Sequence, residues 1–489
     1  MKNPPATQPI AWKDVPGPRG WPLVGNAFQI DRKHLHLQLE EWARQYGSVF
    51  AFSIGRRRFL VITNPEAAAK VLRARPDGFG RQRRLEQVAR EFGFVGLFTV
   101  GGETWKRHRP MVMASFDPAH IKAFFPTLVT VTERLAGRWR VACASGRTID
   151  LHADLMRFTV DVTAAITFGE DVNTIEAGEE AIQAHMECVL PALARRVLSP
   201  FDPPRWWKTR AQRELRGHID ALQAAVQSFI AKARDRMEAD PTLRERPQNM
   251  IQAMVARRDA TTDVTDEDIS GNALMMLLAA KDTTANTLTW LMWMLARNPT
   301  ARASAVREAR EVLAGAVCPT TPEQLARLDW IEACANEAMR LKPVVPSISN
   351  EVLQPCVVEG VQLEPGMTVL CLLRPAAVSE ANFAAAREFR PERWLAGIGG
   401  SQQGLNSAKR VAMPFGAGPR TCPGRYLALS EIKMAAAMLL ANFDIDWVAP
   451  PGGGEPEEVL AITMAPSGME MRVRAAAKNP AELAVVAQV

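Results

Sequence analysis

Cys422 lies in a loop rich in glycine and proline, in surroundings that suit a thiolate. The run Phe415-Gly416-Ala417-Gly418-Pro419-Arg420-Thr421 precedes it, and Pro423-Gly424 follows. Glycine and proline fix turns and let the backbone approach a flat or bulky group. The positive end of the helix predicted to follow, together with Arg420, favours a negatively charged sulfur. We therefore expect a thiolate here, although a lone cysteine without such a context is a small buried hydrophobe.

An acid and an alcohol, Asp282 and Thr283, stand inside the longest predicted helix. The run Thr265-Asp266-Glu267-Asp268 has the form of a capping box, and Pro299 marks the end. The helix should span about 33 residues and roughly 50 Å. A threonine hydroxyl can hold a water molecule, and a carboxylate can relay protons. The alternative is a solvated acid beside a threonine that bonds only its own helix backbone.

Two further pairs have spacings that place both members on one side of a helix. Glu337 and Arg340 are three residues apart and can form an ion pair. Trp105 and Arg109 are four residues apart, so indole and guanidinium can reach the same anion. Each pair by itself is also compatible with an ordinary helix surface.

Together these segments resemble the cytochrome P450 family. The match rests on Phe415-x-x-Gly418-x-Arg420-x-Cys422-x-Gly424, on Ala279-Ala280-Lys281-Asp282-Thr283-Thr284, on Glu337-x-x-Arg340 with Pro391-Glu392-Arg393-Trp394, and on Trp105-x-x-x-Arg109. In that family a cysteine thiolate is the axial ligand of haem iron. The fold implied is mainly helical with small β-sheets, a long central distal helix and a proximal cysteine loop and helix.

The resemblance assigns roles to the motif residues. Cys422 would be the haem iron ligand, with Phe415 packed beside the sulfur and Gly424 giving the ring clearance. Arg420, Trp105 and Arg109 would hold the haem propionates. Asp282 and Thr283 would help deliver protons to dioxygen, beside Ala279.

The same resemblance gives Glu337, Arg340 and Arg393 a structural role, as a buried ion network near the cysteine loop. One departure from the family pattern stands out. Ala280 replaces the usual glycine of the distal helix, and Lys281 is an uncommon neighbour that could pair with Asp282.

The resemblance also places a substrate pocket over the haem. The segments that match the family's substrate contacts supply mostly apolar side chains: Phe98, Met275, Ala279, Val344, Val345, Ile348 and Ile462. A hydrophobic substrate is therefore expected, such as a fatty acid, terpenoid, steroid or aromatic compound. Phe98 is the expected gate above the haem.

The implied activity is that of a bacterial-type haem-thiolate monooxygenase. It would hold haem b, use O2 as co-substrate and insert one oxygen atom into its substrate. Electrons would come ultimately from NAD(P)H through a ferredoxin with its reductase or a flavodoxin-type donor, because no Gly-x-Gly-x-x-Gly motif follows a predicted strand. A peroxide-driven peroxygenase and a non-catalytic haem-thiolate sensor are the alternatives.

Composition narrows the remaining classes. The seven cysteines of the 489 residues are scattered, which argues against disulfides and for a reducing, cytoplasmic compartment. The net charge of +6 lacks a tract suited to nucleic acid, and no apolar run is long enough to span a membrane. The basic residues around the cysteine loop, with Lys106 and Arg107, could attract an acidic electron donor. A monomer is expected.

The chain is predicted to form one catalytic domain over residues 16–475, between a flexible leader at 1–15 and a tail at 476–489. A hairpin is expected at 49–62, with the three arginines 56–58 at its exposed turn. The helix after the cysteine loop should bury one face, along Ala428, Ile432, Ala435, Leu439 and Phe443. His108, between two arginines, is expected to be solvated.

Overall fold

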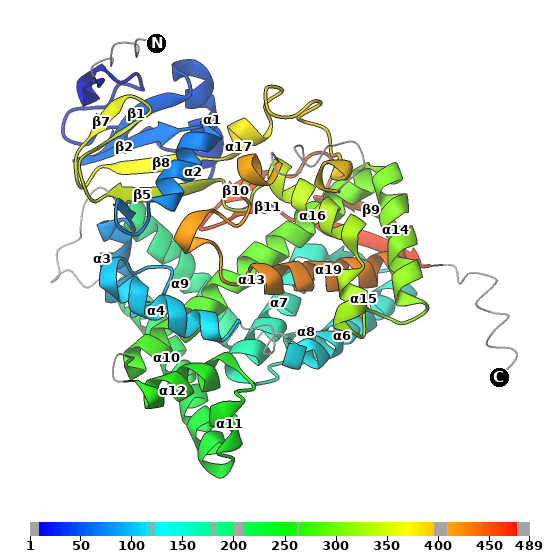
Figure 1. The fold of residues 1–489 in the computed structure, drawn as a ribbon. Helices are drawn as coiled ribbons and strands as arrows, with labels where there is room; N and C mark the ends of the chain where they lie inside the picture. The colour runs from blue at the N-terminus through cyan, green and yellow to red at the C-terminus, as the bar shows by residue number, and fades with distance from the viewer. Residues whose placement is uncertain are drawn as a thin grey trace, which may run out of the picture.

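A computed structural model describes residues 9–116, 122–177, 181–199, 210–261, 264–395 and 408–476 (Figure 1). Helices dominate it, and the predicted fold class is confirmed. The helices are η1 (Trp12–Asp14), α1 (Leu35–Tyr46), α2 (Pro65–Arg73), α3 (Arg83–Glu91), α4 (Gly102–Ala114), α6 (Phe125–Ala144), α7 (Leu151–Phe168), α8 (Thr174–Ala177), α9 (Ala181–Leu198), α10 (Arg210–Ala239), α11 (Thr242–Glu245), α12 (Met250–Ala260), α13 (Asp266–Arg297), α14 (Pro299–Leu313), α15 (Pro322–Ala326), α16 (Asp329–Leu341), α17 (Arg374–Ala377), η2 (Pro391–Trp394), η3 (Gly418–Arg420) and α19 (Arg425–Asn442). The strands are β1 (Val49–Ile54), β2 (Arg57–Ile62), β3 (Phe79–Gly80), β4 (Ile149–Asp150), β5 (Ser347–Val352), β6 (Cys356–Val358), β7 (Val361–Leu363), β8 (Thr368–Leu372), β9 (Phe443–Ala449), β10 (Glu458–Leu460), β11 (Met464–Pro466) and β12 (Glu470–Ala475).

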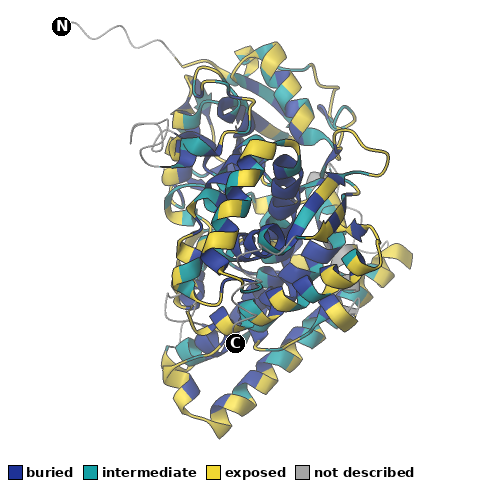
Figure 2. Cartoon of the chain, turned by 90° about the vertical axis from the view of Figure 1, so that its right-hand side faces the viewer, coloured by how far each residue is buried: buried dark blue, intermediate teal, exposed yellow. Residues whose placement is uncertain are grey.

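The central helix α13 has the start and end that its sequence predicts. The Thr265 hydroxyl accepts a hydrogen bond from the Asp268 backbone N–H, and the Asp268 carboxylate accepts one from the Thr265 N–H, which completes the capping box. The helix runs for 32 residues and ends before Pro299. Most of its side chains are buried, and Figure 2 shows buried residues concentrated along the middle of the molecule.

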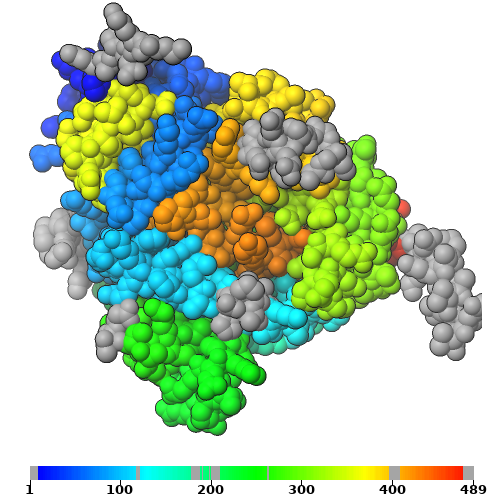
Figure 3. Space-filling view, viewed as in Figure 1, coloured from blue at the N-terminus to red at the C-terminus, as the bar shows by residue number. Residues whose placement is uncertain are grey.

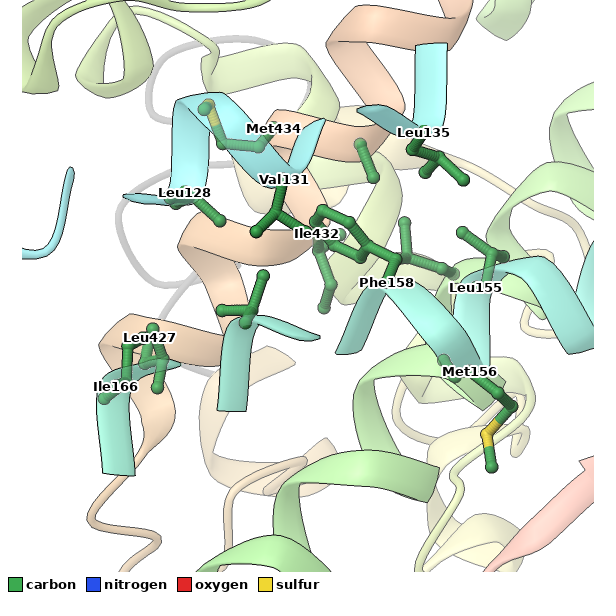
Figure 4. Packing of buried hydrophobic residues seen from close by; sticks show 14 of the residues in the cluster. Leu128, Val131, Leu135, Leu155, Met156, Phe158, Ile166, Leu427, Ile432 and Met434 are labelled. Atoms are coloured by element: carbon green, nitrogen blue, oxygen red, sulfur yellow. The ribbon is translucent and has the colours of Figure 1, made fainter. Parts of the chain in front are cut away.

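Helix α19, which follows the cysteine loop, has an exposed residue, Tyr426, in its first turn and is then buried on all sides rather than on one face. Its residues 431–440 are all buried, so the predicted single apolar stripe is wrong. Figure 4 shows Leu427, Ile432 and Met434 of α19 beside side chains of α6 and α7. A helix enclosed in this way cannot shift without disturbing its neighbours, and it holds the cysteine loop firmly. Phe443, assigned to this helix from the sequence, begins strand β9 instead.

The larger sheet has the strand order β1-β2-β8-β5-β3. The predicted hairpin is present, with Val49 opposite Ile62 and Ile54 opposite Arg57. The arginine cluster is not all turn, because Arg57 and Arg58 are already part of β2. Arg57 donates hydrogen bonds to the carbonyls of Val197 and Ser199, so it fastens this sheet to the end of α9.

The described part of the predicted leader packs on the rest of the chain. The Ile10 N–H donates to the Gly360 carbonyl at 2.8 Å, and Trp12 lies against the cluster around β7. Residues 1–8, and all of the predicted tail except Ala476, lie outside the described residues. In the described part of the chain, no helix has both the length and the apolar character needed to cross a membrane.

Candidate active site

The cysteine loop is a tight, hydrogen-bonded turn. The Cys422 N–H donates to the Phe415 carbonyl at 3.0 Å, and the Thr421 N–H donates to the Gly418 carbonyl at 3.0 Å. Gly418 has φ +73° and lies against α2, where a Cβ would come 2.5 Å from the Leu72 carbonyl oxygen. Only glycine satisfies both conditions, so the sequence here is dictated by the shape of the loop.

Cys422 lies deep in the protein, yet its side chain is exposed. Burial raises the pKa of its thiol, against the lowering effects of the Gly424 N–H and of Arg109 and Arg425. The helix end and the arginines favour a negative sulfur as expected, but they do not outweigh the loss of water, and the thiolate stays a prediction. A deep but uncovered sulfur borders an internal space, where a bound metal ion would deprotonate it.

Ala279 gives a second indication of that internal space. It lies in the middle of α13, where most residues are buried, and is itself exposed. Exposure of a residue in the centre of a core helix indicates an opening beside it.

Four arginines gather near the cysteine loop: Arg75, Arg81, Arg109 and Arg420. Burial, with the charges of Arg81, Arg75 and Arg109, lowers the pKa of Arg420 to about 8. Burial also lowers the pKa of Arg81 to about 10, with a further contribution from Arg75. Among the described residues, none of the four forms an ion pair with an acid. Three of their guanidinium nitrogens are buried and have no hydrogen-bond partner there: Nε of Arg81, and Nε and Nη1 of Arg420. In the described part of the chain the cluster therefore has no ion-paired acid, and only the charge of Glu86 opposes the lowering of the Arg420 pKa.

Aromatic rings and helix α4 hold this cluster. The Arg420 guanidinium lies 4.9 Å from the Trp105 ring centre, and it also donates to the Val100 carbonyl. The Arg81 guanidinium lies 4.3 Å from the Phe98 ring centre. Trp105 and Arg109, both on α4, are therefore brought to the same region as Arg420.

His108 on α4 is fully buried, so the prediction that it is solvated is wrong. Its Nε2 lies 2.7 Å from the Asp268 carboxylate, and its Nδ1 accepts from the Asn272 amide at 3.0 Å. Burial alone would raise the pKa of Asp268, but the His108 hydrogen bond and the Thr265 N–H hold it well below its usual range. This network joins α4 to the start of α13.

The acid–alcohol pair sits on a continuous helix in this structure. The Thr283 hydroxyl donates to the Ala279 carbonyl at 2.9 Å. This is the alternative arrangement given by the sequence, in which the threonine bonds only its own helix backbone. Asp282 is half-buried, whereas Lys281 is buried and its carbonyl accepts a hydrogen bond from Thr159 at 2.9 Å.

Glu431 of α19 is a buried acid beside this part of α13. It forms a side-chain hydrogen bond with Thr284, and its Oε2 has no partner among the described residues. Burial raises the pKa of Glu431 to about 8, although the Thr284 hydroxyl opposes the shift.

The three charged residues of the predicted network meet in the core. Arg340 donates to both Glu337 carboxylate oxygens, at 2.8 and 2.7 Å, and Arg393 Nε donates to the same carboxylate at 3.2 Å. Trp394 Nε1 adds a further hydrogen bond at 2.9 Å. Arg340 also donates to three carbonyls, those of Ala377, Ala386 and Glu388. The buried charges are fully hydrogen-bonded, as burial requires.

The expected substrate residues come from several segments that border the site. Phe98 is 46% exposed, and its loop is tied to α13 because the Leu97 N–H donates to Asn272. Met275 is buried beside Gly96. Ile348 lies near Gly416 of the cysteine loop.

The other expected substrate residues lie on neighbouring segments. The Val344 carbonyl accepts from the Met464 N–H, which draws the turn of Ile462 to that side. Val345 and Ile462 are exposed. Contact of any of these residues with a substrate stays a prediction.

These residues fit a haem group. A flat dianionic cofactor with two carboxylates would supply the missing partners of Arg81 and Arg420, and its metal could bind Cys422 in the space that Ala279 borders. No group of three potential ligands suits a bare metal ion among the described residues.

Comparison with known proteins decides the family. The model of the family described as Cytochrome P450 matches residues 15–471. The chain belongs to the cytochrome P450 family. Its fold matches a crystal structure of the cytochrome P450DA haem domain with a TM-score of 0.82 and 22% identity, covering 97% of this chain and 100% of that one.

Among curated P450 relatives, a self-sufficient cytochrome P450 monooxygenase of Penicillium freii is 28% identical over 470 residues. The match covers 94% of this chain but only 43% of that protein. The chloroplastic carotene epsilon-monooxygenase of Arabidopsis thaliana is 25% identical over 448 residues, covering 88% of this chain and 79% of that protein. These relatives are eukaryotic, so they give no support to the bacterial assignment.

Sequence reasoning missed four residues of this P450 site: Arg75, Arg81, His108 and Glu431. The two arginines lie outside the recognised motifs, and scattered arginines look solvated in a sequence. Glu431 carried a usable signal, since it is the one acid among the mostly apolar residues 427–440 of a core helix.

Proposed function

We propose that this chain is a haem-thiolate monooxygenase that inserts one oxygen atom from O2 into a hydrophobic substrate. The observation that carries the proposal is a cluster of buried and half-buried arginines with no ion-paired acid among the described residues, next to a deep but uncovered cysteine. Haem b would meet both requirements, with Cys422 as ligand and Arg420, Arg109 and Arg81 toward its carboxylates. Haem, when bound, supplies the redox chemistry that activates dioxygen.

The protein's own contribution begins at the sulfur. The Gly424 N–H and the positive charges of Arg109 and Arg425 stabilise a negative Cys422 sulfur, which burial alone would disfavour. The enclosed helix α19 holds the sulfur at a fixed position. Phe415, half-buried beside Arg425, shields the loop from water.

Proton delivery falls to α13. The Thr283 hydroxyl must rotate away from the Ala279 carbonyl to donate toward the cavity, and Asp282 can then resupply its proton from the solvent side. Ala279 borders the cavity one helical turn from Thr283, so both face the reacting atoms.

The substrate is proposed to be a fatty acid, terpenoid, steroid or aromatic compound. Phe98, Met275, Ala279, Val344, Val345, Ile348 and Ile462 would offer it a mainly apolar wall. Phe98 is already in contact with Arg81, so it links the substrate side of the pocket to the cofactor's carboxylates.

Electrons are proposed to come from NAD(P)H through an acidic ferredoxin or flavodoxin-type protein. Figure 3 shows the orange segment that contains Cys422 and α19 reaching the surface between α4 and the helices α14 and α15. Lys409 and Arg410 are exposed there, and Arg73 lies against Gly418. Lys106 adds little, because Glu103 and Asp77 neutralise it. A monomer and a cytoplasmic location stay predictions.

The decisive experiment is spectroscopic. The purified holoprotein, reduced under carbon monoxide, should show the absorption band of thiolate-ligated haem, and Cys422→His should lose that band while keeping bound haem. A library of hydrophobic compounds should then shift the spin state of the wild type. Haem without the thiolate band would contradict the proposed ligand.

The same preparation separates the two alternatives. Turnover with hydrogen peroxide at the electron-driven rate would point to a peroxygenase. A thiolate spectrum with no NAD(P)H consumption, across donors and substrates, would point to a sensor.

A further inference from the structure

Two histidines on neighbouring helices face each other through the same ring nitrogen. Nδ1 of His185, on α9, lies 2.7 Å from Nδ1 of His218, on α10. The ring centres are 5.0 Å apart and the ring planes are inclined by 59°, so the rings meet nitrogen to nitrogen and do not stack. The two residues are 33 positions apart along the chain, and the packing of α9 on α10 brings them together.

The other histidines for which the structure describes a side-chain contact have partners of a different kind. Each of them bonds an acid or a side-chain amide: His34, His36, His108 and His152. Such a partner fixes which ring nitrogen carries the proton and makes the histidine a structural link. Among the described residues, His185 and His218 have only each other. In the uncharged pair one Nδ1 donates its proton and the other accepts it, so the two facing nitrogens share a single proton.

A metal ion can take the place of that shared proton. Neutral imidazole nitrogens are good ligands for Zn²⁺, Cu²⁺ and Ni²⁺. At a Zn–N length of about 2.0 to 2.1 Å, two nitrogens bound to a tetrahedral zinc ion lie about 3.3 Å apart. The Nδ1 atoms are 2.7 Å apart, so the two rings would have to separate by only about 0.6 Å. Small rotations of two half-buried side chains can supply this separation.

The surroundings of the pair suit a bound cation. Two arginines of α10 near His218 are each paired with an acid, Arg210 with Glu214 at 2.8 Å and Arg216 with Asp220 at 2.9 Å. Their charges therefore oppose a metal ion only weakly. Both histidines are half-buried, so water can reach the ion. Since no group of three potential ligands occurs in the described part of the chain, water would fill the other coordination positions.

We propose that His185 and His218 form a binding site for a divalent transition-metal ion that fastens α9 to α10. The ion would bind both Nδ1 atoms and release the shared proton to solvent. At its C-terminal end α9 is already fastened to the larger sheet, because Arg57 donates to the carbonyls of Val197 and Ser199. His185 lies near the start of the same helix, so the ion would secure the opposite end.

The test is a calorimetric titration of the holoprotein with zinc chloride. The protein carries no histidine tag, is dialysed against EDTA beforehand and is kept in a buffer that does not bind zinc. We expect one zinc ion per chain, and no binding of Mg²⁺ or Ca²⁺, which require oxygen ligands. His185→Gln and His218→Gln should each weaken zinc binding at least about tenfold. Glutamine can still form a hydrogen bond between the helices, so these variants remove a ligand and keep the contact.

Two control variants separate this site from others. His34→Gln removes a half-buried histidine elsewhere, and Cys188→Ser removes the exposed thiol one helical turn after His185. Both variants should bind zinc like the wild type. Zinc binding that is lost in either control and kept in both glutamine variants would place the ion elsewhere and overturn the proposal.

Hydrogen exchange provides a second measurement that locates the ion. Zinc should slow exchange of the backbone amides at 181–190 and 214–222 in the wild type, and should leave both glutamine variants unchanged. A wild type that takes up no zinc at a millimolar concentration would overturn the proposal. Glutamine variants that bind zinc as tightly as the wild type would overturn it as well, and would leave the two histidines with an ordinary hydrogen bond.

Discussion

At the scale of single residues, Thr283 carries the sharpest functional question. Its hydroxyl is occupied by the Ala279 carbonyl, so a proton-delivery role requires it to change partners. Thr283→Ala removes the hydroxyl, and we expect product formation to fall about tenfold or more while NAD(P)H consumption continues and hydrogen peroxide accumulates.

Thr283→Ser is the matched control, since it keeps a hydroxyl at the same position and should remain largely coupled. The measurement is the ratio of product to NAD(P)H consumed. An alanine variant as well coupled as the wild type would remove Thr283 from the proton path.

Glu431 supports a prediction about stability and pH. Its pKa is raised to about 8 by burial, whereas in the unfolded chain it is near 4.5. Between these values the folded state binds more protons than the unfolded state, so this group makes the protein less stable as pH rises from about 4.5 to 8. Glu431→Gln should remove that loss.

The variant should therefore match the wild type at pH 4 and gain stability toward pH 8, by about 4 kcal/mol. Urea unfolding of the wild type and the variant across this range measures it. A stability difference that is independent of pH would show that Glu431 is ionised in the fold.

At the scale of elements, the Glu337 network joins α16 to η2 and to the segment before it. Arg340→Leu would leave the Glu337 carboxylate buried without its main partner, and we expect a loss of about 3 to 5 kcal/mol in unfolding free energy and weaker haem retention. Arg390→Ala, which breaks an exposed ion pair with Glu388, should cost about 1 kcal/mol or less. Equal losses in the two variants would contradict the structural role of the network.

How well the sequence predicts an element depends on whether the residues that determine it are neighbours along the chain. The ends of α13 are specified locally by Thr265, Asp268 and Pro299, and the sequence alone identifies all three as helix-end signals. The burial of residues 431–440 of α19 on every side depends on α6, α7 and α13 packing around them, which no local pattern contains. His108 was misjudged for the same reason, because its partners Asp268 and Asn272 are 160 or more residues away along the chain.

The same distinction between local motifs and long-range contacts holds for the site residues. Cys422 and the Glu337–Arg340 pair lie in short motifs and were predicted from them. Arg75 and Arg81 matter only because the fold brings them to Arg420, and their significance could not be seen in the sequence.

At the scale of the whole molecule, stability should depend on the cofactor. The four buried or half-buried arginines, which form no ion pair within the described residues, repel one another, and an anionic ligand that binds only the folded state stabilises it by mass action. Removing haem should lower the thermal midpoint by several degrees or more, and added haem should restore it. Calorimetry of both forms is the measurement, and an unchanged midpoint would contradict the fit between haem and this cluster.

The arginine cluster also bears on which porphyrin the protein will accept. The four arginines attract negative charge, so we expect them to favour a macrocycle for the two carboxylates at its rim more than for the metal at its centre. A porphyrin whose carboxylates are esterified would fill the same space and leave the arginines as unpaired as before. We therefore expect the chain to discriminate its cofactor by the edge of the ring, so that a metal-free porphyrin with free carboxylates competes for the pocket where an esterified haem does not.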